Sequence, residues 1–194
     1  MSVKPLLFLL IFSFCSCKNS SNPESKVNLE QQLTIANNFI DAFYSFNSNE
    51  LLPMLKYAEN SKSEILYYQG WAEGGNYEIV KRYPCEVKND TLIICPVTVK
   101  DDLIKALELN LNVTDTFHIV IKNEKIFSIT TSSNDPPIFY EAEEWIRKNY
   151  PELINEPCKG IWEDGTTPKA CVRAMVEGYS KFIAEKKINS NIEK

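Results

Sequence analysis

The chain has 194 residues, of which 44% are hydrophobic and 24% are charged, values typical of one soluble domain with a sizeable core. Its formal net charge is −5, and its 21 Lys and Arg residues are scattered among 26 Asp and Glu residues. Because the basic residues form no stripe that could neutralise a phosphate backbone, the composition argues against a nucleic-acid partner.

Residues 1–16 have the pattern of a signal peptide. Lys4 is followed by the apolar run Leu6–Phe14, which is much shorter than the roughly 20 residues that a membrane-spanning helix needs. A short apolar core behind a basic residue is typical of an export signal that is removed from the mature chain.

The tetrapeptide FCSC at 14–17 resembles the lipobox of bacterial lipoproteins, in which the cysteine becomes the lipidated first residue of the mature chain. Cys17 follows the small Ser16, whereas Cys15 follows an aromatic residue, so the resemblance implies lipidation at Cys17. More than one acyl chain gives stable anchoring. The resemblance implies a lipid-anchored protein of the bacterial cell envelope, and Lys18 favours the outer membrane. The alternative is a secreted protein that is cut near Ser16 and keeps Cys17 as a free thiol.

The mature chain is expected to consist of a tether, one domain and a tail. Segment 17–28 is rich in Ser and Asn, a composition typical of a flexible tether. We expect a single α+β domain over 29–187 and a frayed tail over 188–194.

Three helices are expected before the first strand. Apolar residues recur every three or four positions over 29–46, which indicates an amphipathic helix. A short helix over 50–57 follows the capping residues 47–49, and a third helical segment over roughly 62–72 ends at the Gly74-Gly75 pair.

The next segment predicts a hairpin that brings two cysteines together. Alternating apolar residues indicate a strand over 77–87, with 92–99 as its partner. A three-residue loop centred on Asp90 would oppose Cys85 to Cys95.

The hairpin register centred on Asp90 also brings two prolines opposite each other. It opposes Tyr83 to Val97, but it also opposes Pro84 to Pro96, and neither proline has an N–H to donate. A register shifted by one residue therefore stays open.

Four cysteines remain in the mature chain besides Cys17, and in an exported protein they predict two disulfides. Of the three possible connectivities, the hairpin favours Cys85–Cys95, which leaves Cys158 to pair with Cys171. The chain has no C-x-x-C motif and its single histidine has no cysteine near it, so the pattern argues against a zinc site.

The remaining elements complete an α+β pattern. The order of helices, antiparallel strands and further helices favours segregated layers over a parallel sheet. The expected elements are a short helical or irregular segment over 100–109, strands over 116–121 and 125–131, and helices over 141–149 and 168–185.

Several strings resemble the nuclear-transport-factor-two-like superfamily, also called the polyketide-cyclase-like or cystatin-like cone. These strings are FIDAFYSFNSNEL at 39–51 and FHIVIKNEKIFSIT at 117–130. The string CEVKNDTLIICPVTVKDDLIKALEL at 85–109 is similar to a secreted subset of that superfamily. The resemblance covers roughly 30–185. It implies a curved antiparallel sheet packed with N-terminal helices in a cone, plus C-terminal helices. A cone of this kind can bind a small molecule at its mouth or pair with a second copy through its sheet face.

One aromatic group stands out as a candidate cavity lining. Tyr67, Tyr68, Trp71 and Tyr77 extend from the third helix to the first strand. Such rings could line a cavity with an apolar body and hydroxyl groups at its rim, and the alternative is packing in the core.

No residue is assigned to catalysis, metal binding or a cofactor. His118 is a lone histidine on a strand, and such a residue is more often hydrogen-bonded than a base. The adjacent Asp101 and Asp102 suit a helix N-cap and its first turn, and Asp41 suits the solvated flank of the first helix.

The leading hypothesis is an envelope lipoprotein with a non-catalytic domain that binds a small apolar ligand or a protein partner. The alternatives are a small isomerase or dehydratase that uses the cone cavity, and an interaction or immunity protein that uses the sheet face. A perturbed carboxylate in a cavity would favour the enzyme, and a cone filled by its own side chains would oppose it.

Overall fold

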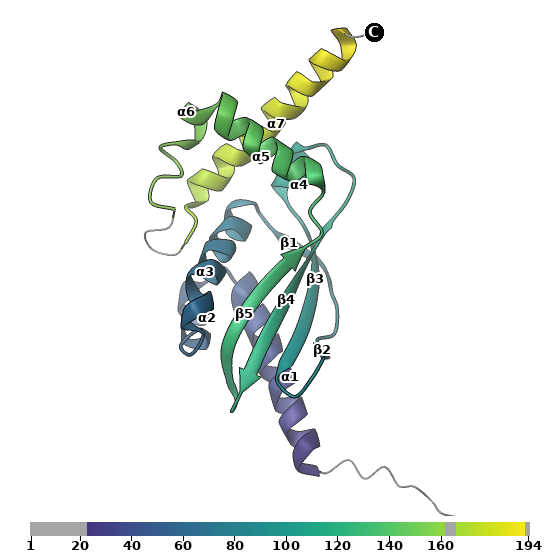
Figure 1. The fold of residues 1–194 in the computed structure, drawn as a ribbon, viewed down its shortest axis with the longest axis vertical. Helices are drawn as coiled ribbons and strands as arrows, with labels where there is room; N and C mark the ends of the chain where they lie inside the picture. The colour runs from purple at the N-terminus through teal and green to yellow at the C-terminus, as the bar shows by residue number, and fades with distance from the viewer. Residues whose placement is uncertain (1–22, 162–165, 193–194) are drawn as a thin grey trace, which may run out of the picture.

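The computed structural model describes residues 23–161 and 166–192. The assignments of 1–16 to a signal peptide and of Cys17 to lipidation fall outside the described residues. The described part is an α+β fold with helices packed on a curved antiparallel sheet (Figure 1), as the sequence predicted. No described helix has the length and apolar character to cross a membrane.

The N-terminal half contributes three helices, α1 (Pro23–Tyr44), α2 (Ser48–Met54) and α3 (Glu59–Gly74). Helix α1 begins at Pro23 and not at Leu29, so residues 23–28 of the expected tether are helical. Proline suits the first position of a helix, because its missing N–H would have no partner there. The polar composition of this segment was therefore a poor guide to its conformation.

The sheet contains β1 (Glu78–Arg82), β2 (Glu86–Val87), β3 (Leu92–Lys100), β4 (Val113–Lys122) and β5 (Lys125–Ser133). The strand order is β1-β3-β4-β5, with β2 also paired to β3, and all pairs are antiparallel. The single strand expected over 77–87 is divided into β1 and β2. Pro84 lies in the gap, and it cannot donate a hydrogen bond to a ladder.

The hairpin combines the two registers that the sequence left open. Val87 opposes Ile93, as a loop centred on Asp90 predicts. Beyond the cysteines, however, Arg82 opposes Val97, so the expected pairing of Tyr83 with Val97 was wrong by one residue. The register changes across the segment that contains Pro84.

Both expected disulfides are present. Cys85 is bonded to Cys95 across the hairpin, and Cys158 is bonded to Cys171 at the start of the last helix. Two disulfides fit a protein of an oxidising, extracytoplasmic compartment.

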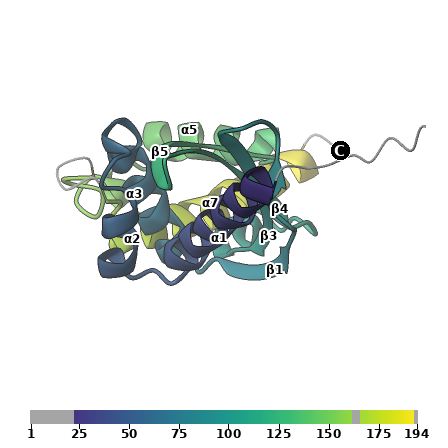
Figure 2. The ribbon, with the colours of Figure 1, turned by 90° about the horizontal axis from the view of Figure 1, so that it is seen from below.

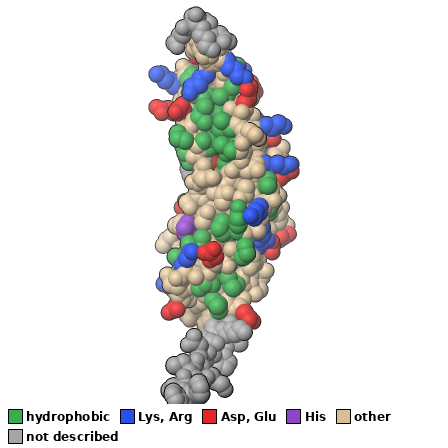
Figure 3. Space-filling view, turned by 90° about the vertical axis from the view of Figure 1, so that its right-hand side faces the viewer, with side chains coloured by type: hydrophobic (Ala, Val, Ile, Leu, Met, Phe, Trp, Pro, Cys, Tyr) green, Lys and Arg blue, Asp and Glu red, His purple; other side chains and the backbone are tan. Residues whose placement is uncertain are grey.

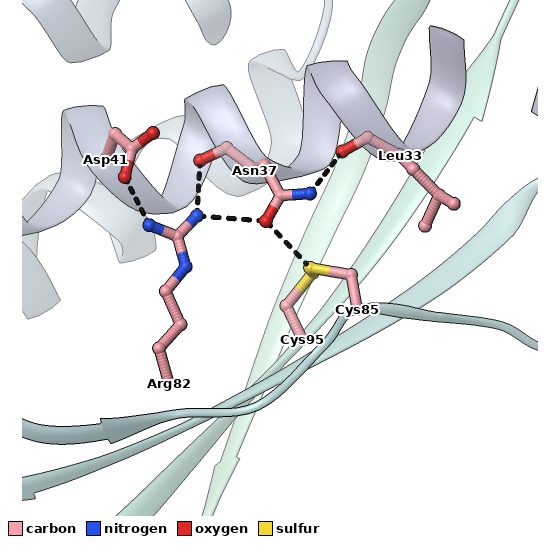
Figure 4. Close-up of a disulfide and its surroundings, with 6 residues drawn as sticks. All are labelled: Leu33, Asn37, Asp41, Arg82, Cys85 and Cys95. Carbon is pink, nitrogen blue, oxygen red and sulfur yellow. Dashed lines mark hydrogen bonds and ion pairs between the residues drawn. A yellow bond between two sulfur atoms is a disulfide. The ribbon is translucent and has the colours of Figure 1, made fainter. Parts of the chain in front are cut away.

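The first disulfide lies against α1, where Arg82 joins the hairpin to the helix (Figure 4). The Arg82 guanidinium pairs with the Asp41 carboxylate and donates to both oxygens of Asn37, at 2.9 and 3.0 Å. The Cys85 sulfur lies 3.7 Å from the Asn37 side-chain oxygen. Asp41 is thus an ion-pair partner and not only a solvated flank.

The sheet curves around α1, with α2 and α3 on the other side of that helix (Figure 2). Alternate residues of β4 face inward and are buried, among them Phe117 and Ile119. The Phe117 ring lies 5.7 Å from the Phe39 ring and 4.9 Å from the Phe43 ring, between ring centroids. Aromatic side chains from α1 and β4 therefore fill the space inside the cone.

The upper part of the molecule in Figure 1 holds α4 (Asp102–Ala106), which lies between β3 and β4 in the chain, and the C-terminal helices α5 (Pro137–Asn149), α6 (Pro151–Ile154) and α7 (Lys169–Ile192). The close approach of α5 and α7 depends on Gly178, because a Cβ there would lie 2.7 Å from the side chain of Ile146. Helix α7 continues through most of the expected tail at 188–194.

Candidate functional site

The four aromatic residues singled out in the sequence line one open pocket. The pocket has a volume of about 350 Å³ and lies between α3, the end of β5 and the start of α5. We call it the α3–α5 pocket. Its aromatic lining is Tyr67, Tyr68, Trp71 and Tyr77, with Phe139 and Tyr140 from α5.

Helix geometry explains why two of these rings meet. Tyr67 and Trp71 are four residues apart on α3, a spacing that places side chains on the same face. Their ring centroids lie 6.2 Å apart with planes inclined by 29°. The two rings also border a second pocket of about 240 Å³, which Arg147 and the Cys158–Cys171 disulfide line.

A glycine on α3 positions this wall of the pocket. A Cβ at Gly70 would lie 2.5 Å from the carbonyl oxygen of Thr167, so glycine allows the segment before α7 to lie directly on the helix. The Thr167 hydroxyl donates a hydrogen bond of 2.8 Å to the Tyr67 carbonyl oxygen. The pocket wall is thereby joined to the C-terminal helix.

Tyr68 joins the pocket to the filled interior of the cone. It lines the pocket, and its ring centroid lies 5.3 Å from that of Phe43 and 6.2 Å from that of Phe117. The sequence left two interpretations of Tyr68 open, cavity lining and core packing, and each describes part of its environment.

A buried carboxylate that sequence reasoning missed lies behind Tyr68. Asp115 on β4 is only 1% exposed and accepts a 3.0 Å hydrogen bond from the Tyr44 hydroxyl on α1. Its other carboxylate oxygen has no hydrogen-bond partner among the described residues. Burial raises the pKa of Asp115 to about 6, although hydrogen bonding from Tyr68 and Tyr44 opposes the rise.

Asp101 is the second buried carboxylate, and it confirms the helix-cap interpretation of the Asp101-Asp102 pair. One oxygen accepts a 2.8 Å hydrogen bond from the Ile104 N–H at the start of α4, while the other has no partner among the described residues. Burial raises the pKa of Asp101 to about 6. Asp102 pairs instead with Arg173 on α7 at 2.6 Å.

Asp135 is the third carboxylate, and it lines the α3–α5 pocket itself. It follows β5 and accepts a 3.3 Å hydrogen bond from the Tyr140 hydroxyl. Burial is the largest cause of a raised pKa at Asp135. Its charge also contributes to the raised pKa values of Asp101 and Asp115, so the three carboxylates lie within electrostatic reach of one another.

The sequence contained one signal for this acidic group. Asp115 occupies an odd position of β4, between the buried Val113 and Phe117, where the period of the strand calls for an apolar side chain. Asp135 and Glu143, which line the pocket itself, carry no comparable local signal.

His118 lies on the opposite face of the sheet. Its side chain is half-buried and hydrogen-bonds the Ser132 hydroxyl at 3.1 Å. His118 is not among the residues that line the α3–α5 pocket.

The acidic group has no geometry for a metal ion. Within 23–161 and 166–192, no group of three or more His, Cys, Asp or Glu residues could hold a metal.

Comparison with protein-family models, with curated proteins and with solved structures finds no match for this chain. The function is therefore inferred from the pocket itself.

Proposed function

We propose that this protein is a lipid-anchored protein of the bacterial envelope whose domain binds a small, largely apolar molecule in the α3–α5 pocket. The observation that carries the proposal is the convergence of Tyr67, Tyr68, Trp71 and Tyr77 on one open pocket. The anchor is the lipidated Cys17, and the two disulfides suit a domain that works outside the cytoplasm.

The pocket has the dimensions and chemistry of a ligand site. Its volume of about 350 Å³ lies within the roughly 300–1,000 Å³ range of small-molecule sites. Aromatic rings supply most of the contact area of such a site, and a few polar groups orient the ligand. Here the polar residues at the pocket are the tyrosines with their hydroxyls, Asp135 and Glu143 with their carboxylates, and the β5 residues Thr131, Ser132 and Ser133.

Binding is favoured over catalysis because the most perturbed carboxylates do not line the pocket. Asp115 and Asp101 are buried and are not part of its described lining, and Asp101 borders a separate pocket beside α4. Aromatic rings fill the interior of the cone, where an enzyme of this architecture would place its substrate.

The outer face of the sheet is a weaker candidate than the pocket. In the lower part of Figure 3, apolar side chains stand in small separate patches with charged side chains among them. Exposed apolar residues that are scattered among charges are normal on a soluble surface.

Native mass spectrometry of the full chain, purified from its native host in detergent, tests the proposal. We expect a co-purifying small molecule with the wild type and its loss from Trp71→Leu. The matched control is Trp145→Leu, because Trp145 packs against Phe182 and Tyr150 away from the pocket. A wild type without any bound small molecule, or equal retention by both variants, would contradict the proposal.

A further inference from the structure

We propose that the ligand of the α3–α5 pocket is an organic cation, with an alkylated ammonium group held against the aromatic rings and beside Asp135. This inference rests on the proposed function of the pocket and names the chemical class of its ligand.

The aromatic lining suits a cation because the face of each ring carries partial negative charge. An ammonium group over a tyrosine or tryptophan face is attracted by this charge, and several rings around one alkylated ammonium form the usual aromatic cage. The α3–α5 pocket presents Tyr67, Tyr68 and Trp71 from α3, Tyr77 from the following loop and Tyr140 from α5. Four of these five rings also carry a hydroxyl group.

The charged residues of the lining are all acidic. Asp135 and Glu143 line the pocket, and its described lining contains no lysine or arginine. Glu143 already has a partner, because Arg147 pairs with it at 2.6 Å. Asp135 makes no ion pair with any described residue and accepts only from hydroxyl groups. Asp135 is therefore the carboxylate whose charge is available to a ligand.

Two further carboxylates add to the negative potential behind the rings. Asp101 and Asp115 are 7% and 1% exposed, and each keeps one oxygen without a hydrogen-bond partner in the described part of the chain. A buried carboxylate without a counter-ion is costly. Asp101, Asp115 and Asp135 all contribute to the raised pKa of Tyr77 in the pocket wall, which shows that their field extends to the pocket.

The alternatives fit this surrounding less well. An anionic ligand would approach Asp135 and Glu143 without a basic residue of the described lining to receive it. An uncharged apolar ligand would contact the rings but leave the buried carboxylates without compensation. An organic cation is the ligand class that interacts favourably with both the aromatic rings and the carboxylates of the site.

The test compares choline with 3,3-dimethylbutan-1-ol, which has the same shape but a carbon in place of the charged nitrogen. Each probe is titrated into the full chain in detergent and followed by ligand-observed NMR. We expect choline to bind about tenfold more tightly than the alcohol. Asp135→Asn should remove most of this difference by weakening choline alone. The matched control is Glu64→Gln, because Glu64 is exposed on α3 and does not line the pocket.

The outcomes separate this inference from the proposed function. Equal binding of choline and the alcohol would overturn the cation assignment and leave a pocket for apolar molecules. Unchanged choline binding by Asp135→Asn would overturn the placement of the ammonium group beside Asp135. Absence of choline binding would also overturn it. The co-purification experiment with Trp71→Leu is independent of both probes, so only its failure removes the binding site itself.

Discussion

The Tyr44 hydroxyl on α1 donates a 3.0 Å hydrogen bond to the Asp115 carboxylate on β4. The Tyr44 ring also packs against Phe43 and Phe117, at 5.0 and 6.1 Å between ring centroids. A polar contact thus joins the first helix to the centre of the sheet inside an aromatic core. Without this hydrogen bond, the buried Asp115 carboxylate would lack this donor, and the fold would be less stable.

The change Tyr44→Phe keeps the ring but removes the donor to Asp115. Leaving a buried acceptor unsatisfied costs about 1–3 kcal/mol, and more for a charged group. We expect the free energy of unfolding to fall by at least that amount at neutral pH, measured by denaturant titration. The control is Tyr57→Phe, because Tyr57 is 43% exposed. Equal losses in the two variants would contradict a specific role for the Tyr44 hydroxyl.

Asp115 should make the stability of the fold depend on pH. Its pKa is raised to about 6 from an ordinary value of 3.8, so the folded state binds its proton more tightly than the unfolded state. The stabilisation is complete below the unfolded pKa and is lost as the pH rises through about 6. This difference between the folded and the ordinary pKa of Asp115 corresponds to about 3 kcal/mol in the free energy of unfolding.

Asp115→Asn tests this pH dependence, because asparagine keeps the shape but does not titrate. We expect the wild type to lose stability relative to this variant between about pH 4 and pH 7, in denaturant titrations at each pH. Asp101 and Asp135 face the same region and also have raised pKa values, so the variant should keep a smaller pH dependence that comes from these two residues. A constant difference between the two proteins at every pH would refute the assignment.

The Cys158–Cys171 disulfide should stabilise the fold mainly by restricting the unfolded chain. The bridge closes a short loop with a sequence separation of 13 residues, for which about 2–3 kcal/mol is expected. We predict that Cys158→Ser or Cys171→Ser lowers the melting temperature under oxidising conditions. In excess reductant the variants and the wild type should melt together. An equal loss in both conditions would mean that the cysteines matter only through packing.

The proposed lipid anchor has its own test. Cys17→Ala should release the protein from washed membranes, because the proposal makes Cys17 the attachment point of the acyl chains. Cys15→Ala should leave the protein on the membrane, since the proposal assigns this cysteine to the discarded signal peptide. Fractionation followed by immunoblotting measures both variants, and membrane retention of Cys17→Ala would refute the lipoprotein assignment.

Local patterns in the sequence determined much of the fold. The spacing of Phe39, Ile40 and Phe43 predicted the buried stripe of α1, because a helix repeats its faces every three to four residues. The turn at Asp90 predicted the Cys85–Cys95 disulfide, because the centre of a hairpin determines which residues oppose each other. The spacing of Tyr67 and Trp71 likewise placed two rings on one face.

The acidic side of the pocket was decided only by the tertiary structure. Asp101, Asp115 and Asp135 belong to separate segments, and the pairing of β3, β4 and β5 brings them into electrostatic reach of one another. Strand alternation separates two faces but does not say which face packs against the helices. The sheet curves around α1, so the face that contains Asp115 is buried against the helices and His118 lies on the opposite face.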